Sequence, residues 1–239
     1  MSGHSKWSTI KRKKGAADAK RGVIFTRLSK DITLAAKQGG GSIEMNPALR
    51  LAVKKAKTSN MPSSNIEKAI KKGTGDLPGV IYEDCLYEGY GPKSVAILIE
   101  VMTDNKNRTL PEIRSIMTKN GGNLGESGCV SWIFEKKGIL TIQISNITED
   151  DLMNHLDNSE IEDIIFHDDH YEIIIKPDDF NSISKIFDIN NIEYDGEISL
   201  VAQNLVELSS DEANKVINLL ELIEDHEDVQ KVHTNFEIK

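Results

Sequence analysis

Apolar residues in the first third of the chain recur at the spacing of amphipathic helices. Between residues 16 and 37 they follow every fourth position along one side, while cations gather on another side. A second helix is predicted to begin at Asn46-Pro47, because Asn caps a helix and Pro suits its first turn. A third is predicted from Ser64, where the order S-N-I-E fits a capping box, to a stop at Gly73. The pattern predicts three helices.

Beyond these helices the pattern changes to short apolar runs that alternate with helical segments. Strands are predicted at residues 93–103 and 129–135, on either side of a helix at 110–120. The segment that joins this region to the helices, residues 74–79, is rich in Gly and Pro and is predicted to be a linker. Residues 1–75 therefore form a domain of their own.

Residues 138–204 follow the order β-α-β-β-α-β, which predicts a ferredoxin-like unit. Its expected strands are 139–144, 161–166, 171–176 and 197–202, and its expected helices are 149–157 and 180–190. A helix at 210–224 and a strand at 229–238 have no partner inside this unit. We expect them to return to the middle segment, so that 80–137 and 205–239 form one domain. The predicted fold class is multidomain, with an amino-terminal three-helix domain and two α+β domains, the third inserted into the second.

Charge is distributed very unevenly along this pattern. The net charge is -9, yet residues 1–75 hold 17 Lys or Arg against 4 Asp or Glu, and residues 76–239 hold 12 against 34. A basic domain joined to an acidic remainder is typical of a protein that meets a polyanion at one end. The simpler alternative is a charged helical domain with no such partner. We favour polyanion binding, because basic blocks of this kind are the electrostatic footprint of nucleic-acid binding.

The opening segment combines cations with an aromatic ring. Four consecutive cations can neutralise phosphates, and Trp7 could stack on an unpaired base or pack against the first helix. The predicted nucleic-acid-binding residues are Lys6, Trp7, Lys11, Arg12, Lys13, Lys14, Lys20, Arg27, Lys30, Arg50, Lys54 and Lys57. The sequence has no zinc-finger spacing, RNA-recognition signature or basic zipper, so it supports phosphate contact more than the reading of bases.

The remaining composition narrows the class of protein. The hydrophobic fraction of 38% suits a globular protein with a sizeable core. Cys85 and Cys129 have no further Cys or His at metal-ligand spacing, which favours a reduced, cytoplasmic protein without a cofactor. We expect no membrane span and no signal peptide, because no apolar run approaches the ~18 residues that a span needs.

Several segments resemble the bacterial YebC/PmpR family. They begin with Gly3-His4-Ser5-Lys6-Trp7 and continue through almost the whole chain at the spacing of that family. The other matching segments are Asp18 to Gly22, Phe25-Thr26, Asn60-Met61-Pro62, Tyr87 to Pro92, Asp104 to Thr109, Gly121 to Gly125, Asp228-Val229-Gln230 and Asn235-Phe236. Between residues 138 and 204 the match is mostly one of pattern.

The resemblance implies a three-domain fold whose third domain is inserted into the second. It also implies one of two roles in gene expression. Family members are described as transcriptional regulators that bind DNA, while mitochondrial relatives activate translation and some bacterial members are linked to ribosomes. The chain is therefore expected to regulate transcription, or else to be a translation factor that binds ribosomal RNA.

Two loops of the middle segment have residues that suit anions. Residues 104–109 lie between a strand and a helix, so Arg108 could face a phosphate or carboxylate, or the segment could serve only to cap the helix. Residues 121–125 are rich in Gly but follow a helix and lack the Lys and Ser/Thr pair of a phosphate-binding loop. A helix stop with a tight turn is the better interpretation.

No set of catalytic residues can be named. Residues 125–129 lack the final Gly of a nucleophile elbow, and we expect a turn there. His167-Asp168-Asp169-His170 has ligand-type side chains but falls at a predicted hairpin tip, where Asp is favoured by turn geometry, so a turn is preferred to a metal site. The acidic run 221–228 is expected to be a solvated helix end, or a surface for a basic protein partner. The chain is predicted not to be an enzyme.

Overall fold

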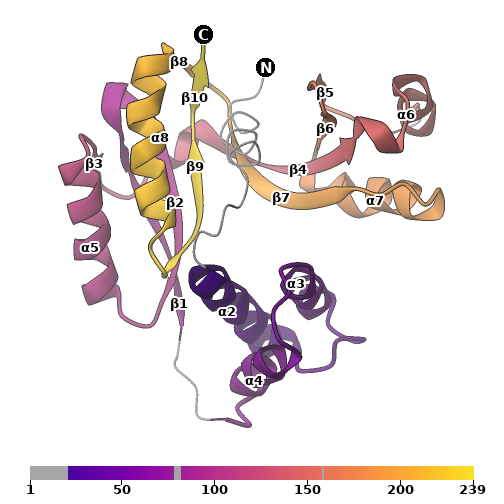
Figure 1. Cartoon of the computed structure of the whole chain (residues 1–239), viewed down its shortest axis with the longest axis horizontal. Helices are drawn as coiled ribbons and strands as arrows, with labels where there is room; N and C mark the ends of the chain where they lie inside the picture. The colour runs from indigo at the N-terminus through magenta and orange to yellow at the C-terminus, as the bar shows by residue number, and fades with distance from the viewer. Residues whose placement is uncertain (1–20, 78–81, 158) are drawn as a thin grey trace.

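The computed structural model describes residues 21–77, 82–157 and 159–239. Three bodies succeed one another in it: a group of helices, a sheet covered by helices, and a second α+β unit reached through two long strands (Figure 1). The third body is inserted into the second, because the chain returns to the first sheet with its last long strand. This arrangement confirms the fold class predicted from the sequence.

The helical body consists of α2 (Arg21–Gly39), α3 (Pro47–Thr58) and α4 (Ser63–Thr74). Asn46 caps α3 as predicted, since its side-chain oxygen accepts from the Leu49 backbone N–H at 3.0 Å. The start of α4 differs from the predicted capping box: the helix begins after Pro62, and no side chain caps it. The α4 helix also ends later than expected, at Gly75, where φ is +85°.

The helices pack on the apolar sides that the periodicity predicts. Their shared core is Leu28, Ile32, Ala35, Ala36, Leu49, Ala52, Val53, Ala56, Met61, Ile66 and Ala69. Gly73 lies where α4 crosses α2, and a Cβ at this position would stand 2.4 Å from the Thr33 carbonyl oxygen. Thr33 also donates from its hydroxyl to the Ala69 carbonyl at 3.1 Å. Close approach of the two backbones explains Gly73, which sequence reasoning took for the helix stop.

The second body is an antiparallel sheet in the order β3-β1-β2-β9. Its strands are β1 (Glu83–Tyr90), β2 (Ala96–Thr103), β3 (Asn123–Leu124) and β9 (Val229–Thr234). Two helices, α5 (Lys106–Lys119) and α8 (Ser210–Glu224), cover one face of this sheet, and their apolar sides form its core (Figure 1). A short parallel pair, β8 (Val206–Leu208) with β10 (Phe236–Ile238), extends the closing segment.

The third body has the predicted order β-α-β-β-α-β and a sheet in the order β5-β6-β4-β7. Its elements are β4 (Phe134–Gln143), α6 (Glu149–Leu156), β5 (Asp163–Phe166), β6 (His170–Ile175), α7 (Phe180–Ile189) and β7 (Asp195–Ala202). The helices pack on one face of this sheet around Leu140, Ile173 and Phe187. The ferredoxin-like unit is confirmed.

Two strand predictions in the middle of the chain are wrong. The strand expected at 129–135 is a turn followed by the 3₁₀ segment Ser131–Ile133, and β4 then runs unbroken through Gly138. The pairing of β4 with β7 extends from Phe134 opposite Ala202 to Thr141 opposite Asp195. One end of this ribbon packs against β2 and the other end belongs to the third body (Figure 1). The ribbon therefore connects the two bodies.

Candidate nucleic-acid interface

The outward sides of α3 and α4 carry the exposed cations of the helical body. Arg50, Lys54 and Lys57 lie on one flank of α3, one residue on from its buried apolar stripe. Further exposed cations on these helices are Lys55, Lys68, Lys71 and Lys72. Within the described ranges, none of the recorded ion pairs involves Lys54, Lys57 or Lys71. These ammonium groups can therefore meet an external anion.

Arg50 has a second role beside its exposure. Its guanidinium donates to the Ile43 carbonyl at 3.2 Å and to the Glu44 carbonyl at 2.8 Å. These bonds hold the turn that joins α2 to α3. The planar guanidinium has five N–H donors, so donors remain after these two bonds. The predicted position of Arg50 on a solvent-facing cationic surface agrees with its exposure.

The prediction of a solvent-facing cation is wrong for Lys30. Its ammonium is buried between α2 and the second body, with a side chain only 4% exposed, and it lies 2.6 Å from Asp228 Oδ1. It also donates to the Met102 and Glu227 carbonyls, each at 3.0 Å. An ammonium so enclosed keeps its charge by pairing within the protein, so Lys30 cannot neutralise a phosphate.

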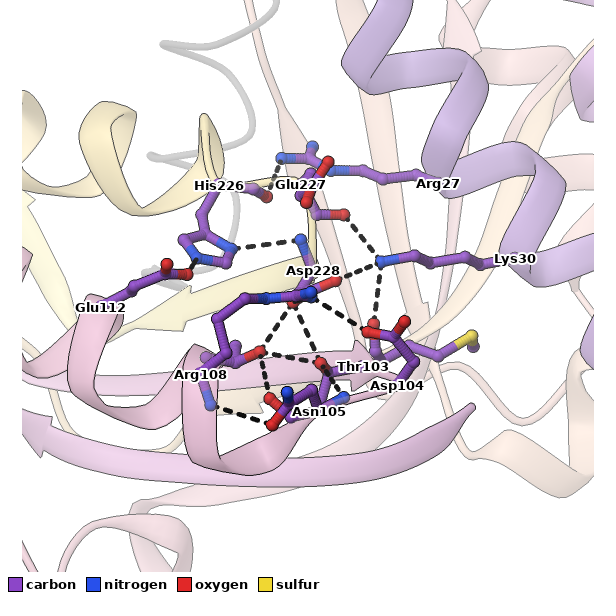
Figure 2. A network of polar contacts seen from close by, with 12 residues as sticks. Arg27, Lys30, Thr103, Asp104, Asn105, Arg108, Glu112, His226, Glu227 and Asp228 are labelled. Atoms are coloured by element: carbon purple, nitrogen blue, oxygen red, sulfur yellow. Dashed lines mark hydrogen bonds and ion pairs between the residues drawn. The ribbon is translucent and has the colours of Figure 1, made fainter. Parts of the chain in front are cut away.

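Arg27 turns toward the same region. Its guanidinium donates to the His226 carbonyl at 3.4 Å (Figure 2). Burial lowers the pKa of Arg27, and the nearby carboxylates of Glu224 and Asp225 oppose that shift. Helical periodicity placed Arg27 and Lys30 together on one side of α2, and that side faces the second body.

Asp228 is the centre of the polar network that joins these bodies (Figure 2). Its carboxylate accepts from Lys30 on one oxygen, and on the other it accepts from Thr103 at 3.0 Å, Thr109 at 2.7 Å and Arg108 at 2.8 Å. Burial alone would raise the pKa of Asp228, but these hydrogen bonds and the charge of Lys30 outweigh burial and hold that pKa below its usual range. The expectation of a solvated acidic run is wrong at this residue, whose side chain is 3% exposed.

The loop before α5 supplies most of this network. Asn105 caps α5 by accepting from the Arg108 backbone N–H at 3.1 Å, which satisfies the capping alternative of the sequence prediction. The Arg108 guanidinium contacts the carboxylates of Asp228 and Asp104, the latter at 3.0 Å. The anions that Arg108 meets in the structure are thus carboxylates of the same chain.

A second buried carboxylate was not predicted from the sequence. Glu88 of β1 accepts from the backbone N–H groups of Gly128, Val130 and Ser131 at 2.8 to 2.9 Å. Burial by itself raises the pKa of Glu88, but these backbone hydrogen bonds dominate and lower it. Residues 125–129 therefore form a turn held by Glu88, as expected for a segment that is not a nucleophile elbow. No local pattern marks Glu88 as their partner.

The remaining predicted residues lie outside the described parts of the chain. They are Lys6, Trp7, Lys11, Arg12, Lys13, Lys14 and Lys20. Their contact with nucleic acid stays a prediction. No helix within the described residues is both long and apolar enough to cross a membrane.

Comparison with known proteins assigns the chain to a family. Residues 5–76 match the model described as the TACO1/YebC protein N-terminal domain, and residues 82–236 match the TACO1/YebC second and third domain. The chain belongs to the TACO1/YebC family. The resemblance found in the sequence is thereby confirmed, and these two matches agree with a helical amino-terminal body followed by two α+β bodies.

Relatives of this YebC-family chain match it over its full length. A "probable transcriptional regulatory protein" of Desulfotalea psychrophila is 51% identical over 240 residues, covering 100% of this chain and 96% of the relative. One of the same name from Dictyoglomus turgidum is also 51% identical with the same coverage. The crystal structure of a conserved hypothetical protein from Aquifex aeolicus superposes with a TM-score of 0.83 at 39% identity, covering 93% and 92% of the two chains. The names of the relatives support a regulatory role.

Proposed function

We propose that this chain is a non-enzymatic regulator of gene expression that binds duplex DNA through the outward sides of α3 and α4. The observation that carries the proposal is the set of exposed lysines on these helices, whose apolar sides are used up in the helical core. Phosphate contacts from Lys and Arg supply most of the affinity of proteins for nucleic acid without sequence preference. The regulatory names of the relatives agree with such a ligand.

The distribution of charge supports the same proposal at larger scale. The helical third is basic, while the remainder holds 34 Asp or Glu against 12 Lys or Arg. A polyanion attracts the first region and repels the second. Bound nucleic acid would therefore contact the helical body, and the two α+β bodies would face solvent or protein partners.

Two corrections narrow the surface proposed from sequence. Lys30 is excluded because its ammonium is enclosed with Asp228, and Arg27 turns toward the same interface. What remains in the described chain is α3 with Arg50, Lys54 and Lys57, together with the lysines of α4. The basic opening segment adds a second predicted phosphate contact.

The test compares two triple variants of the full-length chain. In the first, Lys54, Lys57 and Lys71 are replaced by Ala; in the matched control, Lys119, Lys185 and Lys215, exposed lysines on helices of the acidic bodies, are replaced instead. Both variants lose the same formal charge. If each lysine of the first set contacts a phosphate, the log-log dependence of affinity on salt should become shallower by about 0.9 per contact. Fluorescence anisotropy on duplex DNA at several salt concentrations measures this.

The control separates local contact from total charge. An equal loss of affinity in both variants would contradict the proposal, because it would assign binding to net charge alone. Ribosomal RNA as a second probe addresses the other role implied by the family. Much tighter binding to that RNA than to duplex DNA at equal salt would overturn the transcriptional proposal in favour of translation.

A further inference from the structure

The hairpin between β5 and β6 brings two histidines together at its tip. His167 and His170 flank the turn residues Asp168 and Asp169, and the His167 backbone N–H donates to the His170 carbonyl at 2.9 Å. This bond closes the turn and makes the two side chains neighbours. Their imidazole rings stack with centroids 4.3 Å apart and planes inclined by 16°.

A carboxylate from the same strand completes the cluster. Glu172 follows His170 by two positions on β6, so both side chains lie on one face of the strand. The Glu172 Oε2 atom is 3.8 Å from His167 Nε2. One ligand-type atom from each of these residues lies within 4.8 Å of the other two. Three donors from one hairpin therefore converge on one point.

The surroundings of the cluster favour a bound cation. The side chains of His170 and Glu172 are 1% and 4% exposed, while His167 at 19% leaves a path from solvent. His170 Nδ1 lies 2.6 Å from Asp169 Oδ1, which leaves Nε2 of that ring to face a metal. A carboxylate that holds the other nitrogen of a ligating histidine orients the ring and raises its basicity.

We propose that His167, His170 and Glu172 form a binding site for a divalent transition-metal ion, with Zn²⁺ as the best fit. Two imidazole nitrogens and one carboxylate oxygen are a donor set that Zn²⁺ accepts, and hard ions such as Mg²⁺ prefer oxygen ligands alone. Coordination requires one of the stacked rings to rotate about χ2, a soft torsion. Three protein ligands leave a fourth tetrahedral position for water.

The sequence alone favoured a simple turn here, because it showed only two histidines around two turn-forming aspartates. The structure adds Glu172 as a third donor and Asp169 as an orienting partner. The site belongs to the third body and is independent of the proposed nucleic-acid surface on α3 and α4.

Isothermal titration of Zn²⁺ into the full-length, tag-free chain tests the site. The wild type should bind one ion per chain at this cluster. His167→Gln and Glu172→Gln should each weaken that binding about tenfold or more, since even the loss of an orienting partner costs 10 to 100-fold. The matched control is His155→Gln, which removes a histidine of α6 in the same body. Thermal unfolding without metal checks that every variant folds.

The outcomes decide the proposal. Retained affinity in His155→Gln together with loss in His167→Gln supports the site. If Glu172→Gln fails to fold, the partly exposed His167 still decides it. Absence of stoichiometric Zn²⁺ binding in the wild type, or an equal loss in His155→Gln, overturns it.

Discussion

Asp228 illustrates how a single buried charge can hold two bodies together. Its carboxylate is enclosed with the Lys30 ammonium and three further side-chain donors, so each charge is compensated where water is excluded. Removing one member of such a pair leaves the other charge buried without compensation, which is more costly than the absence of both.

Substitution of one partner should therefore destabilise the chain strongly. We expect Asp228→Ala or Lys30→Met to lower the free energy of unfolding by about 3–5 kcal/mol, and the double variant to lose less than the sum. Urea unfolding followed by circular dichroism measures both. Lys176→Met is the control, because Lys176 pairs with Glu160 at an exposed site, and it should change stability by about 1 kcal/mol at most. Additive losses in the double variant would show that the pair is not coupled.

At the scale of elements, α2 is the helix against which α3 and α4 pack and also the helix that meets the second body. Its crossing with α4 depends on Gly73, since a Cβ there would stand 2.4 Å from the Thr33 carbonyl and 2.6 Å from the Ala36 Cβ. Both obstacles are backbone or the first side-chain atom, so neither can swing away. The helices would have to separate.

Gly73→Ala should destabilise the helical body despite the better helix propensity of Ala. That propensity is worth about 1 kcal/mol, whereas overpacking in a close contact costs about 1–3 kcal/mol before the helices shift. Thermal or urea unfolding measures the balance. Lys72→Ala, next to it on an exposed position of α4, should alter stability by about 0.5 kcal/mol or less. A stabilised Gly73→Ala variant would refute the close crossing.

At the scale of the whole molecule, two buried carboxylates link the bodies and loops to pH. Asp228 joins the helical body to the second, and Glu88 holds the turn that precedes the β4–β7 ribbon. The pKa of each is lower in the folded chain than its ordinary value. Both groups therefore contribute stability that is fully present above the unfolded pKa of about 4 and is lost as pH falls through the folded pKa.

The free energy of unfolding should accordingly fall on acidification below about pH 4. Urea unfolding between neutral pH and pH 3 measures the slope. Asp228→Asn and Glu88→Gln should each begin with lower stability at neutral pH and show a shallower loss in acid, because the proton-linked contribution is gone. Parallel curves for the variants and the wild type would contradict the assignment of the acid response to these carboxylates.

Local sequence patterns determined the amino-terminal helices, the ferredoxin-like order of the third body and the return of the chain to its middle segment, because helix and strand periodicity act over a few residues. The basic character of the first third is likewise a property of composition. The β1 strand was missed because its exposed and buried positions are mixed with acidic residues, and the continuity of β4 through Gly138 depends on its pairing with β7.

Only the tertiary structure decided which cations face solvent. Lys30 and Lys54 look alike in the sequence, but Lys30 meets a carboxylate 198 positions away and is enclosed, while Lys54 stays exposed. The same holds for Glu172, which joins two histidines through the hairpin pairing. Charge and ligand type are written in each residue, whereas burial and partner depend on how distant segments pack, and the electrostatic energy of a group depends on both.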